Sequence, residues 1–270
     1  MHCHILPGLD DGARNLREAI AMAKMAEEDG IEKIVATPHL FRRHGDFQDL
    51  SLIEEKYQEL CAALKEHNVH LEIFTGAEVR ISHDLIPEIK KNKKQLVLNQ
   101  SSYLFIEFPS DHVFSGAKNL LFDLMNEGVT PIIAHPERNS VFIRNPEILY
   151  ELIERGGLAQ ANSGSFLGVY GSRTAEAVTH FLKLGLIHFI ATDGHNTRSI
   201  VPRLSEAVKR AEEIVGKERA RRLVKENPQA VLENRELADL PLPSNPKAKD
   251  RSFQIKIPSF FRRKNHSEPQ

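Results

Sequence analysis

The sequence predicts an α/β fold, a barrel of parallel strands alternating with helices. Six short apolar runs alternate with stretches in which apolar residues recur at helical spacing. Five of the six runs end in histidine or an acidic residue, and chemistry at strand ends is typical of a barrel, whose active site forms where the strands stop. Together with a short first segment around His2 and His4, the pattern predicts seven strands, one fewer than the usual eight.

The expected elements follow one another regularly along the chain. The strand-like runs cover residues 33–39, 72–78, 104–107, 131–135, 158–162 and 188–195. Helical spacing predicts helices over residues 16–26, 52–64, 120–125, 148–153, 177–184 and 205–215, and a short one around 219–236. Glycines that act as helix stops follow three of them. Repeated helix, glycine and buried strand are typical of a parallel sheet covered on both faces.

The domain organisation is one large domain and a tail. Alternation of strands and helices is regular over residues 1–236, which favours a single domain there. Composition then changes, because residues 239–270 contain five prolines, few periodic apolar positions and an excess of Lys and Arg. We expect residues 237–270 to be a disordered basic tail.

Composition excludes several function classes. The net charge of −1 argues against a general nucleic-acid binder, which needs an excess of cationic residues on one face. Cys3 and Cys61 form no CxxC pair, so we expect a reducing compartment and no disulfide. There is no signal-like N-terminus and no apolar run long enough to span a membrane, so we expect a cytoplasmic protein.

Histidines and acids at the strand ends are candidate metal ligands. His2 and His4 are two residues apart, so on a strand they point to the same face, and Asp10 and Asp11 follow in a glycine-flanked turn. Later runs add candidates at the equivalent position, namely His39, Glu78, Glu107, His135, Asp193 and His195. Imidazole and carboxylate groups without thiolate suit Mn, Zn or Fe, and this number of donors can hold two or three ions.

Arginines close to these strand ends indicate the substrate class. Arg138 stands three residues after His135, Arg42 and Arg43 follow His39, and Arg198 follows His195. Adjacent metal ions can clamp the attacking and leaving oxygens of a displacement at phosphorus, and guanidinium groups suit phosphate oxygens. The residues therefore favour a phosphoesterase over the amide-hydrolysing barrels that use related metal chemistry.

Six motifs together resemble a known family. They are residues 1–12 (MHCHILPGLDDG), 36–39 (ATPH), 75–78 (TGAE), 133–138 (IAHPER), 161–163 (ANS) and 191–196 (ATDGHN). They look like the polymerase and histidinol phosphatase superfamily, and within it they resemble the bacterial protein-tyrosine phosphatases of capsule and exopolysaccharide operons. The resemblance covers residues 1 to about 236.

The resemblance implies a distorted seven-stranded (β/α)7 barrel, similar to a TIM barrel, with a site for two or three Mn²⁺ ions. The implied ligands are His2, His4, Asp11, His39, Glu78, Glu107, His135, Asp193 and His195. Arg138, His39 and Asp193 would be catalytic, and a metal-bound hydroxide would attack phosphorus without a phosphoenzyme. Relatives carry a second arginine where Ile200 stands here, so Arg198 or Arg203 would join Arg42, Arg43 and Arg138 in binding substrate.

The implied substrate is phosphotyrosine on a bacterial tyrosine autokinase that controls polysaccharide synthesis, and the resemblance also raises a ring-like homo-oligomer. Two alternatives remain open: a small-molecule phosphatase of the histidinol-phosphatase type, for which the loop 40–46 would be decisive, and a regulatory homologue with weakened catalysis. A cysteine-based phosphatase is excluded, because it needs Cys and Arg six apart and Leu9 and His67 stand at that distance from the two cysteines.

Overall fold

Every strand pair of the computed structural model, which describes residues 1–40 and 50–247, is parallel. A six-stranded sheet has the order β2-β4-β5-β6-β7-β8, and β1 pairs with β3 in a separate two-stranded sheet. The bounds are β1 Lys33–Ala36, β2 His39–Leu40, β3 Glu72–Thr75, β4 Glu78–Arg80, β5 Tyr103–Glu107, β6 Thr130–Ala134, β7 Leu158–Asn162 and β8 Phe189–Ala191. All six predicted runs are confirmed as strands, two of them split in two.

The prediction of a closed seven-stranded barrel is not confirmed. The first segment contributes one bridging residue, Cys3, which pairs with Ala36 on one side and Gly194 on the other. Both split runs break at residues that interrupt a ladder: Pro38 lacks an N–H, and a Cβ on Gly76 would lie 2.7 Å from the Leu98 side chain. The sheet is therefore not closed in the described residues, and Cys3 links β1 to the residues after β8 only through single bridges.

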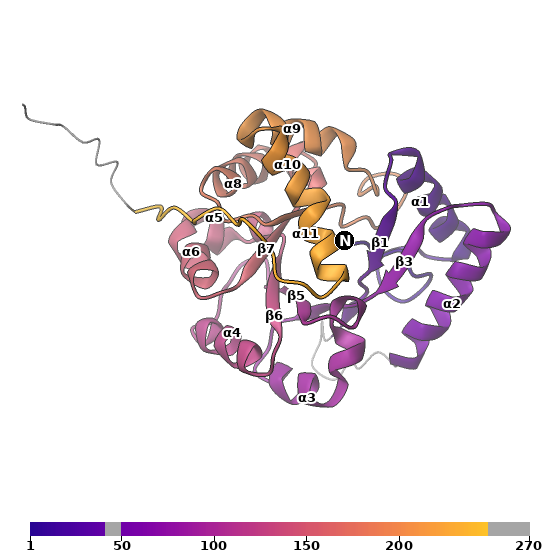
Figure 1. The fold of residues 1–270 in the computed structure, drawn as a ribbon, viewed down its shortest axis with the longest axis horizontal. Helices are drawn as coiled ribbons and strands as arrows, with labels where there is room; N and C mark the ends of the chain where they lie inside the picture. Colours follow the sequence, from indigo (N-terminus) through magenta and orange to yellow (C-terminus); the bar gives the residue numbers. More distant parts are fainter. Residues whose placement is uncertain (41–49, 248–270) are drawn as a thin grey trace, which may run out of the picture.

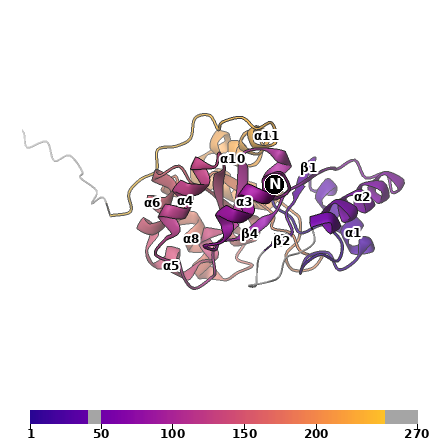
Figure 2. The same ribbon diagram turned by 90° about the horizontal axis from the view of Figure 1, so that it is seen from below.

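Most helices lie around the outside of the strands, whereas α11 lies across the middle of the view in Figure 1. Their bounds are α1 Leu16–Glu28, α2 Leu50–Glu66, α3 Leu85–Leu96, α4 Ala117–Asn126, α5 Ser140–Arg144, α6 Pro146–Glu154, α7 Ser163–Phe166, α8 Ser172–Lys183, α9 Ser205–Val215, α10 Lys217–Val224 and α11 Glu226–Leu232, with short 3₁₀ turns η1 Leu98–Gln100 and η2 Pro136–Arg138. Seen from below in Figure 2, α1, α2 and β1 lie together at one end of the molecule.

The predicted helices are confirmed, except that one of them is split, and α3 and the short helices α5 and α7 were not predicted. The expected helix around 219–236 is two helices, α10 and α11, because Lys225 leaves helical geometry between them (φ −125°). Helix α3 was not predicted, because its apolar stripe consists of little more than Leu85, Ile89 and Leu96 among four lysines. None of the helices in residues 1–40 and 50–247 is both long and apolar enough to cross a membrane.

Alternating side chains divide the strands between two apolar clusters. On β5, Leu104 and Ile106 join the large cluster packed under the helices, whereas Tyr103 and Phe105 join a smaller one. The smaller cluster draws one or two residues from most strands and consists of Val35, Leu98, Tyr103, Phe105, Ile132, Ala134, Leu158, Phe189 and Val231. The Phe105 ring lies 4.7 Å from the His2 ring, so this inner cluster forms the floor beneath the candidate site.

Residues 237–247, the described part of the predicted tail, lie against the domain. The Ser244 amide donates to the Leu184 carbonyl (2.8 Å), Arg222 pairs with Asp239 and Lys247 pairs with Glu147. Residues 248–270 lie outside the described part of the chain. The domain boundary at residue 236 stays a prediction.

Candidate metal centre

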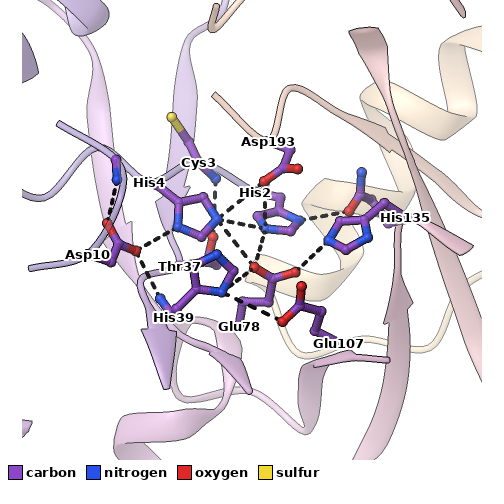
Figure 3. Close-up of polar contacts among 12 residues, drawn as sticks. His2, Cys3, His4, Asp10, Thr37, His39, Glu78, Glu107, His135 and Asp193 are labelled. Carbon is purple, nitrogen blue, oxygen red and sulfur yellow. Dashed lines mark hydrogen bonds and ion pairs between the residues drawn. The ribbon is translucent and has the colours of Figure 1, made fainter. Parts of the chain in front are cut away.

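The carboxyl ends of the strands deliver polar side chains to one buried place (Figure 3). The two-residue repeat of β5 puts Glu107 on the same face as Phe105, above the inner apolar cluster. Glu78 begins β4 beside His39 of β2, because these two residues are register partners. His2, His4, Glu78 and Asp193 are almost completely buried, between 0 and 1 % exposed.

Two of the strand ends adopt backbone conformations that few residues tolerate. His135 follows β6 with φ 32°, and Asp193 follows β8 with φ 49°. Left-handed backbone at a residue that is not glycine costs about 1–3 kcal/mol and persists where the surroundings impose it. Strain of this kind is common at functional sites, and here it accompanies two of the predicted residues.

Eight of the nine predicted ligands fall into three overlapping groups whose ligand atoms lie within 4.8 Å of one another. The groups are His4, Asp11, His39 and His195; His2, His4, Glu78 and Asp193; and His39, Glu78 and Glu107. His135 belongs to none of them, since its Nε2 lies 2.8 Å from Glu78 Oε1 and makes a hydrogen bond there. The structure therefore brings His135 to the site as a partner of Glu78.

The central group has the chemistry of a cation site. Nε2 of His2 and Nε2 of His4 lie 3.2 Å apart, and both lie 3.2–3.4 Å from Glu78 Oε2 and Asp193 Oδ1. Those two buried carboxylate oxygens have no hydrogen-bond partner in the described residues. His4 Nδ1 faces the Asp10 carboxylate at 2.7 Å and donates its proton there, so Nε2 is the ring nitrogen that a metal ion would bind. Converging acceptor atoms in a dry site need a positive charge among them, and a divalent ion fits.

Both carboxylates of this group are held ionised. Burial alone would raise the pKa of Asp193, but the neighbouring rings of His2 and His4 outweigh it and keep that pKa well below its usual range. Burial likewise opposes ionisation of Glu78, and His2 and His135 overcome it, so its pKa also lies well below the usual value. For His135, burial lowers the pKa, but the bond to Glu78 prevails and raises it.

Two residues support these groups: Asp10, which the sequence offered as a candidate ligand, and Arg80, which was not predicted. Asp10 accepts from His4 Nδ1, from the backbone amide of His39 (2.9 Å) and from that of Gly12 (2.9 Å). Arg80 pairs with Glu107 at 3.0 Å. The place of Asp10 in the turn beside Asp11 is what indicated it in the sequence. Arg80 gave no signal, because its proximity to Glu107 depends on the register of β4 with β5.

Arg138 borders the centre on one side. Its Nη1 donates to Asp193 Oδ2 (3.0 Å), and its guanidinium carbon lies 4.6 Å from the centre of the Tyr170 ring. Both residues line a cavity of about 250 Å³ together with Glu107 and His135, and the wall contains the aromatic side chains of Phe108 and Phe142. The cavity thus opens between the metal-binding groups and an aromatic surface.

The remaining predicted arginines are not brought into the three groups. Arg198 and Arg203 are exposed, and Arg203 lines a neighbouring cavity of about 230 Å³ with Tyr170 and Ile200. Arg42 and Arg43 lie outside the described residues, as does most of the loop 40–46. Of the predicted substrate-binding arginines in the described residues, Arg138 is the one that contacts a member of these groups.

The fold and this site define a parallel α/β protein with a buried imidazole and carboxylate centre suited to divalent metal ions. More specifically, the chain belongs to the capsular polysaccharide synthesis CpsB/CapC family, whose model matches residues 1–233.

Curated relatives and a solved structure agree with this placement. The chain is 38 % identical over 200 residues to tyrosine-protein phosphatase YwqE of Bacillus subtilis, covering 74 % of this chain and 78 % of the relative. It is 30 % identical over 240 residues to tyrosine-protein phosphatase CpsB of Streptococcus agalactiae, covering 87 % and 98 %. It superposes with a TM-score of 0.85 and 36 % identity on a crystal structure from work on YwqE of B. subtilis and CpsB of Streptococcus pneumoniae, described as unique metal-dependent tyrosine phosphatases, over 90 % of this chain and 97 % of that one.

Proposed function

We propose that the protein is a metal-dependent protein-tyrosine phosphatase that hydrolyses phosphotyrosine in proteins. The observation that carries the proposal is the convergence of ligand atoms from His4, Glu78 and Asp193 directly beside the Arg138 guanidinium. The names of the relatives support the substrate class, since YwqE and CpsB are tyrosine-protein phosphatases.

We further propose Mn²⁺ as the metal, in two or three ions, with Zn²⁺ or Fe as other ions that this donor set would accept. Three overlapping groups of ligand atoms support that number, and Glu78, which belongs to two of them, would bridge neighbouring ions. When bound, such ions polarise phosphoryl oxygens and lower the pKa of water.

The protein's own residues would position the phosphate. Arg138 uses Nη1 on Asp193 and has further N–H donors for two phosphate oxygens. The Tyr170 ring restricts the plane of the guanidinium, so less freedom is lost when substrate binds. The aromatic wall of the adjoining cavity would receive the phenyl ring, with Phe108 and Tyr170 as contacts. His39, whose ring nitrogens lack hydrogen-bond partners in the described residues, and Asp193 would complete the catalytic set.

One assay tests the proposal against the small-molecule alternative. Protein supplied with Mn²⁺ is offered a phosphotyrosine peptide and histidinol phosphate in parallel, and phosphate release is measured. We expect turnover of the peptide that chelation abolishes, and a loss of about 100-fold or more in His135→Ala. Turnover that survives chelation would contradict the metal chemistry. Preference for histidinol phosphate would support a metabolite phosphatase. Absence of turnover with both compounds would support a regulatory homologue.

The physiological substrate that we propose is a phosphotyrosine protein of the polysaccharide synthesis system, a bacterial tyrosine autokinase. Support comes from the family, which is described by capsular polysaccharide synthesis. The test is dephosphorylation of such a kinase by the metal-loaded protein, followed with an antibody to phosphotyrosine.

A further inference from the structure

Strand β7 ends at the centre without contributing a member of the three groups. Its last residues bring two amides instead, Gln160 and Asn162, which are two positions apart and therefore on the same face of the strand. Both side chains are completely buried, at 0 % exposed. Buried amides are costly unless they are hydrogen-bonded, so their partners indicate what they do.

The two amides form a continuous hydrogen-bonded chain between His2 and Asp193. Asn162 Nδ2 lies 2.6 Å from Asp193 Oδ2, Gln160 Nε2 lies 2.8 Å from Asn162 Oδ1, and His2 Nδ1 lies 2.8 Å from Gln160 Oε1. Arg138 Nη1 donates to the same Asp193 oxygen. His2 comes from the first segment, Gln160 and Asn162 from β7, and Asp193 from just after β8, so the chain of bonds joins three segments of the site.

Which atom donates in each of these hydrogen bonds follows from the Asp193 carboxylate at one end of the chain of bonds. The Asp193 carboxylate, which already accepts from Arg138, can only accept, so Asn162 must present its NH₂ group to it. Asn162 then offers its oxygen to Gln160, which must present its own NH₂ group. Gln160 consequently offers its oxygen to His2, and that contact requires a proton on Nδ1.

The consequence for the centre concerns two ligand atoms. With the proton on Nδ1, His2 has its lone pair on Nε2, the atom that lies 3.3 Å from Asp193 Oδ1 and 3.4 Å from Glu78 Oε2. At Asp193 both donors bind Oδ2, which leaves Oδ1 directed at the same point. The chain of bonds thus selects one nitrogen of His2 and one oxygen of Asp193.

We propose that Gln160 and Asn162 are positioning residues of the metal centre, which hold His2 in its Nδ1–H tautomer and Asp193 with Oδ1 toward the ion. The inference rests on the proposed metal-dependent function, because it assigns these amides a role in binding its ion. The backbone of β7 is also fixed at this place, because the backbone N–H of Asn162 donates to the Glu137 carboxylate (2.8 Å), in the turn that carries Arg138.

The test is a double-mutant cycle read by metal binding. Metal-free full-length protein is titrated with Mn²⁺ by calorimetry for wild type, Gln160→Met, His2→Ala and the double variant. We expect Gln160→Met to weaken binding by about 10–100-fold in the wild-type background. In the His2→Ala background the loss should be several-fold smaller, because the direct contact of Gln160 with a ligand is gone and only the path through Asn162 to Asp193 remains.

A matched control separates positioning from general destabilisation. Asn227 is another buried amide, 6 % exposed, whose Nδ2 donates to the His188 carbonyl (2.7 Å) far from the three groups. Asn227→Leu should lower the melting temperature and leave Mn²⁺ affinity unchanged. Equal losses from Gln160→Met in both backgrounds, or wild-type affinity in that variant, would overturn the proposal.

A second measurement reads the tautomer directly. In Zn²⁺-loaded protein labelled with ¹⁵N-histidine, we expect His2 to show a protonated Nδ1, and coordination through Nδ1 would overturn the proposal. Neither measurement uses hydrolysis. If Gln160→Met shows normal peptide turnover and unchanged Mn²⁺ affinity, this inference is wrong and the proposed function stands. If the wild type hydrolyses no peptide but the variants show the expected differences in Mn²⁺ affinity, the proposed function is wrong and this inference stands.

Discussion

Replacing Asp10 by asparagine separates the residue that orients the metal centre from its neighbour Asp11, a candidate ligand. The Asp10 carboxylate accepts three hydrogen bonds: Oδ2 from His4 Nδ1 and the His39 amide, and Oδ1 from the Gly12 amide. An asparagine has one oxygen and one NH₂ group. Whichever way it turns, the NH₂ group faces a donor, either at Gly12 or at His4 and His39.

The expected magnitude follows from the pKa of Asp10. Burial would raise this pKa, but His4 and the backbone amides outweigh it and lower it from 3.8 to about 2. At 1.36 kcal/mol per unit, the folded protein favours the anion by about 2 kcal/mol. Because the pKa is depressed in the folded state, this stability is present above pH 4 and is lost as the pH falls through about 2.

We therefore expect Asp10→Asn to lower the free energy of unfolding at pH 7 by about 2 kcal/mol, measured by urea denaturation of the metal-free protein. Mn²⁺ affinity should fall by about 10–100-fold, because His4 loses the partner that orients it. Asp11→Asn is the comparison, since the Asp11 side chain is 51 % exposed and its Oδ1 lies 3.5 Å from His39 Nε2. It should reduce the number of ions bound, with a smaller loss of stability. Wild-type stability in Asp10→Asn, or an equal loss in Asp11→Asn, would refute the reasoning.

Three further changes have definite expected outcomes. A Cβ on Gly12 would lie 2.1 Å from the His4 carbonyl oxygen, so Gly12→Ala should displace His4, lower the melting temperature and weaken Mn²⁺ binding by about 10-fold or more. Burial, and to a smaller extent Arg219, lower the pKa of His188 from 6.5 to about 4. Between these pH values the unfolded state binds a proton that the folded state does not. The free energy of unfolding of the metal-free protein should therefore fall by about 3 kcal/mol as the pH falls from 6.5 to 4. The variant His188→Asn keeps an acceptor for the Ala159 amide. Its free energy of unfolding, measured by urea denaturation at the two pH values, should change less with pH than that of the wild type. Arg138→Lys should lower kcat/KM for a phosphotyrosine peptide by roughly 100-fold while the number of bound Mn²⁺ ions, measured by elemental analysis, stays the same.

The sequence was sufficient to predict the strands and the place of the candidate site, because both follow from a local repeat. Polar residues at the ends of apolar runs, such as Glu78 and His39, must meet where parallel strands stop, whatever the details of the loops between them. Helix spacing was equally local, and it failed at α3, where lysines occupy most of the positions.

Residues whose role depends on distant partners could not be predicted in this way. Gln160 acquires its partner from a residue 158 positions earlier in the chain, and Asn162 from one 31 positions later. The end of β7 lacked a good ligand in the sequence, and the structure fills that position with hydrogen bonds. Closure of the barrel also depends on long-range pairing, and the short first segment supplies only the single bridges of Cys3, which leave the sheet of the described chain unclosed.

The arrangement implies that folding and metal binding are coupled. In the absence of an ion, two ionised carboxylate oxygens lie 3.2–3.4 Å from ring nitrogens of His2 and His4 above an apolar floor. Burial lowers the pKa of His4 there, but Asp10, Asp193 and Glu78 outweigh it and raise that pKa well above its usual value. The left-handed backbone at His135 and Asp193 costs about 1–3 kcal/mol at each residue. An ion binds this set of ligands only in the folded state, because the ligands come from segments that are far apart in the unfolded chain. Its binding free energy therefore adds to the stability of the fold, and the hydrogen bonds of Asp10, Gln160 and Asn162 are what keep the ligand atoms close enough for that gain.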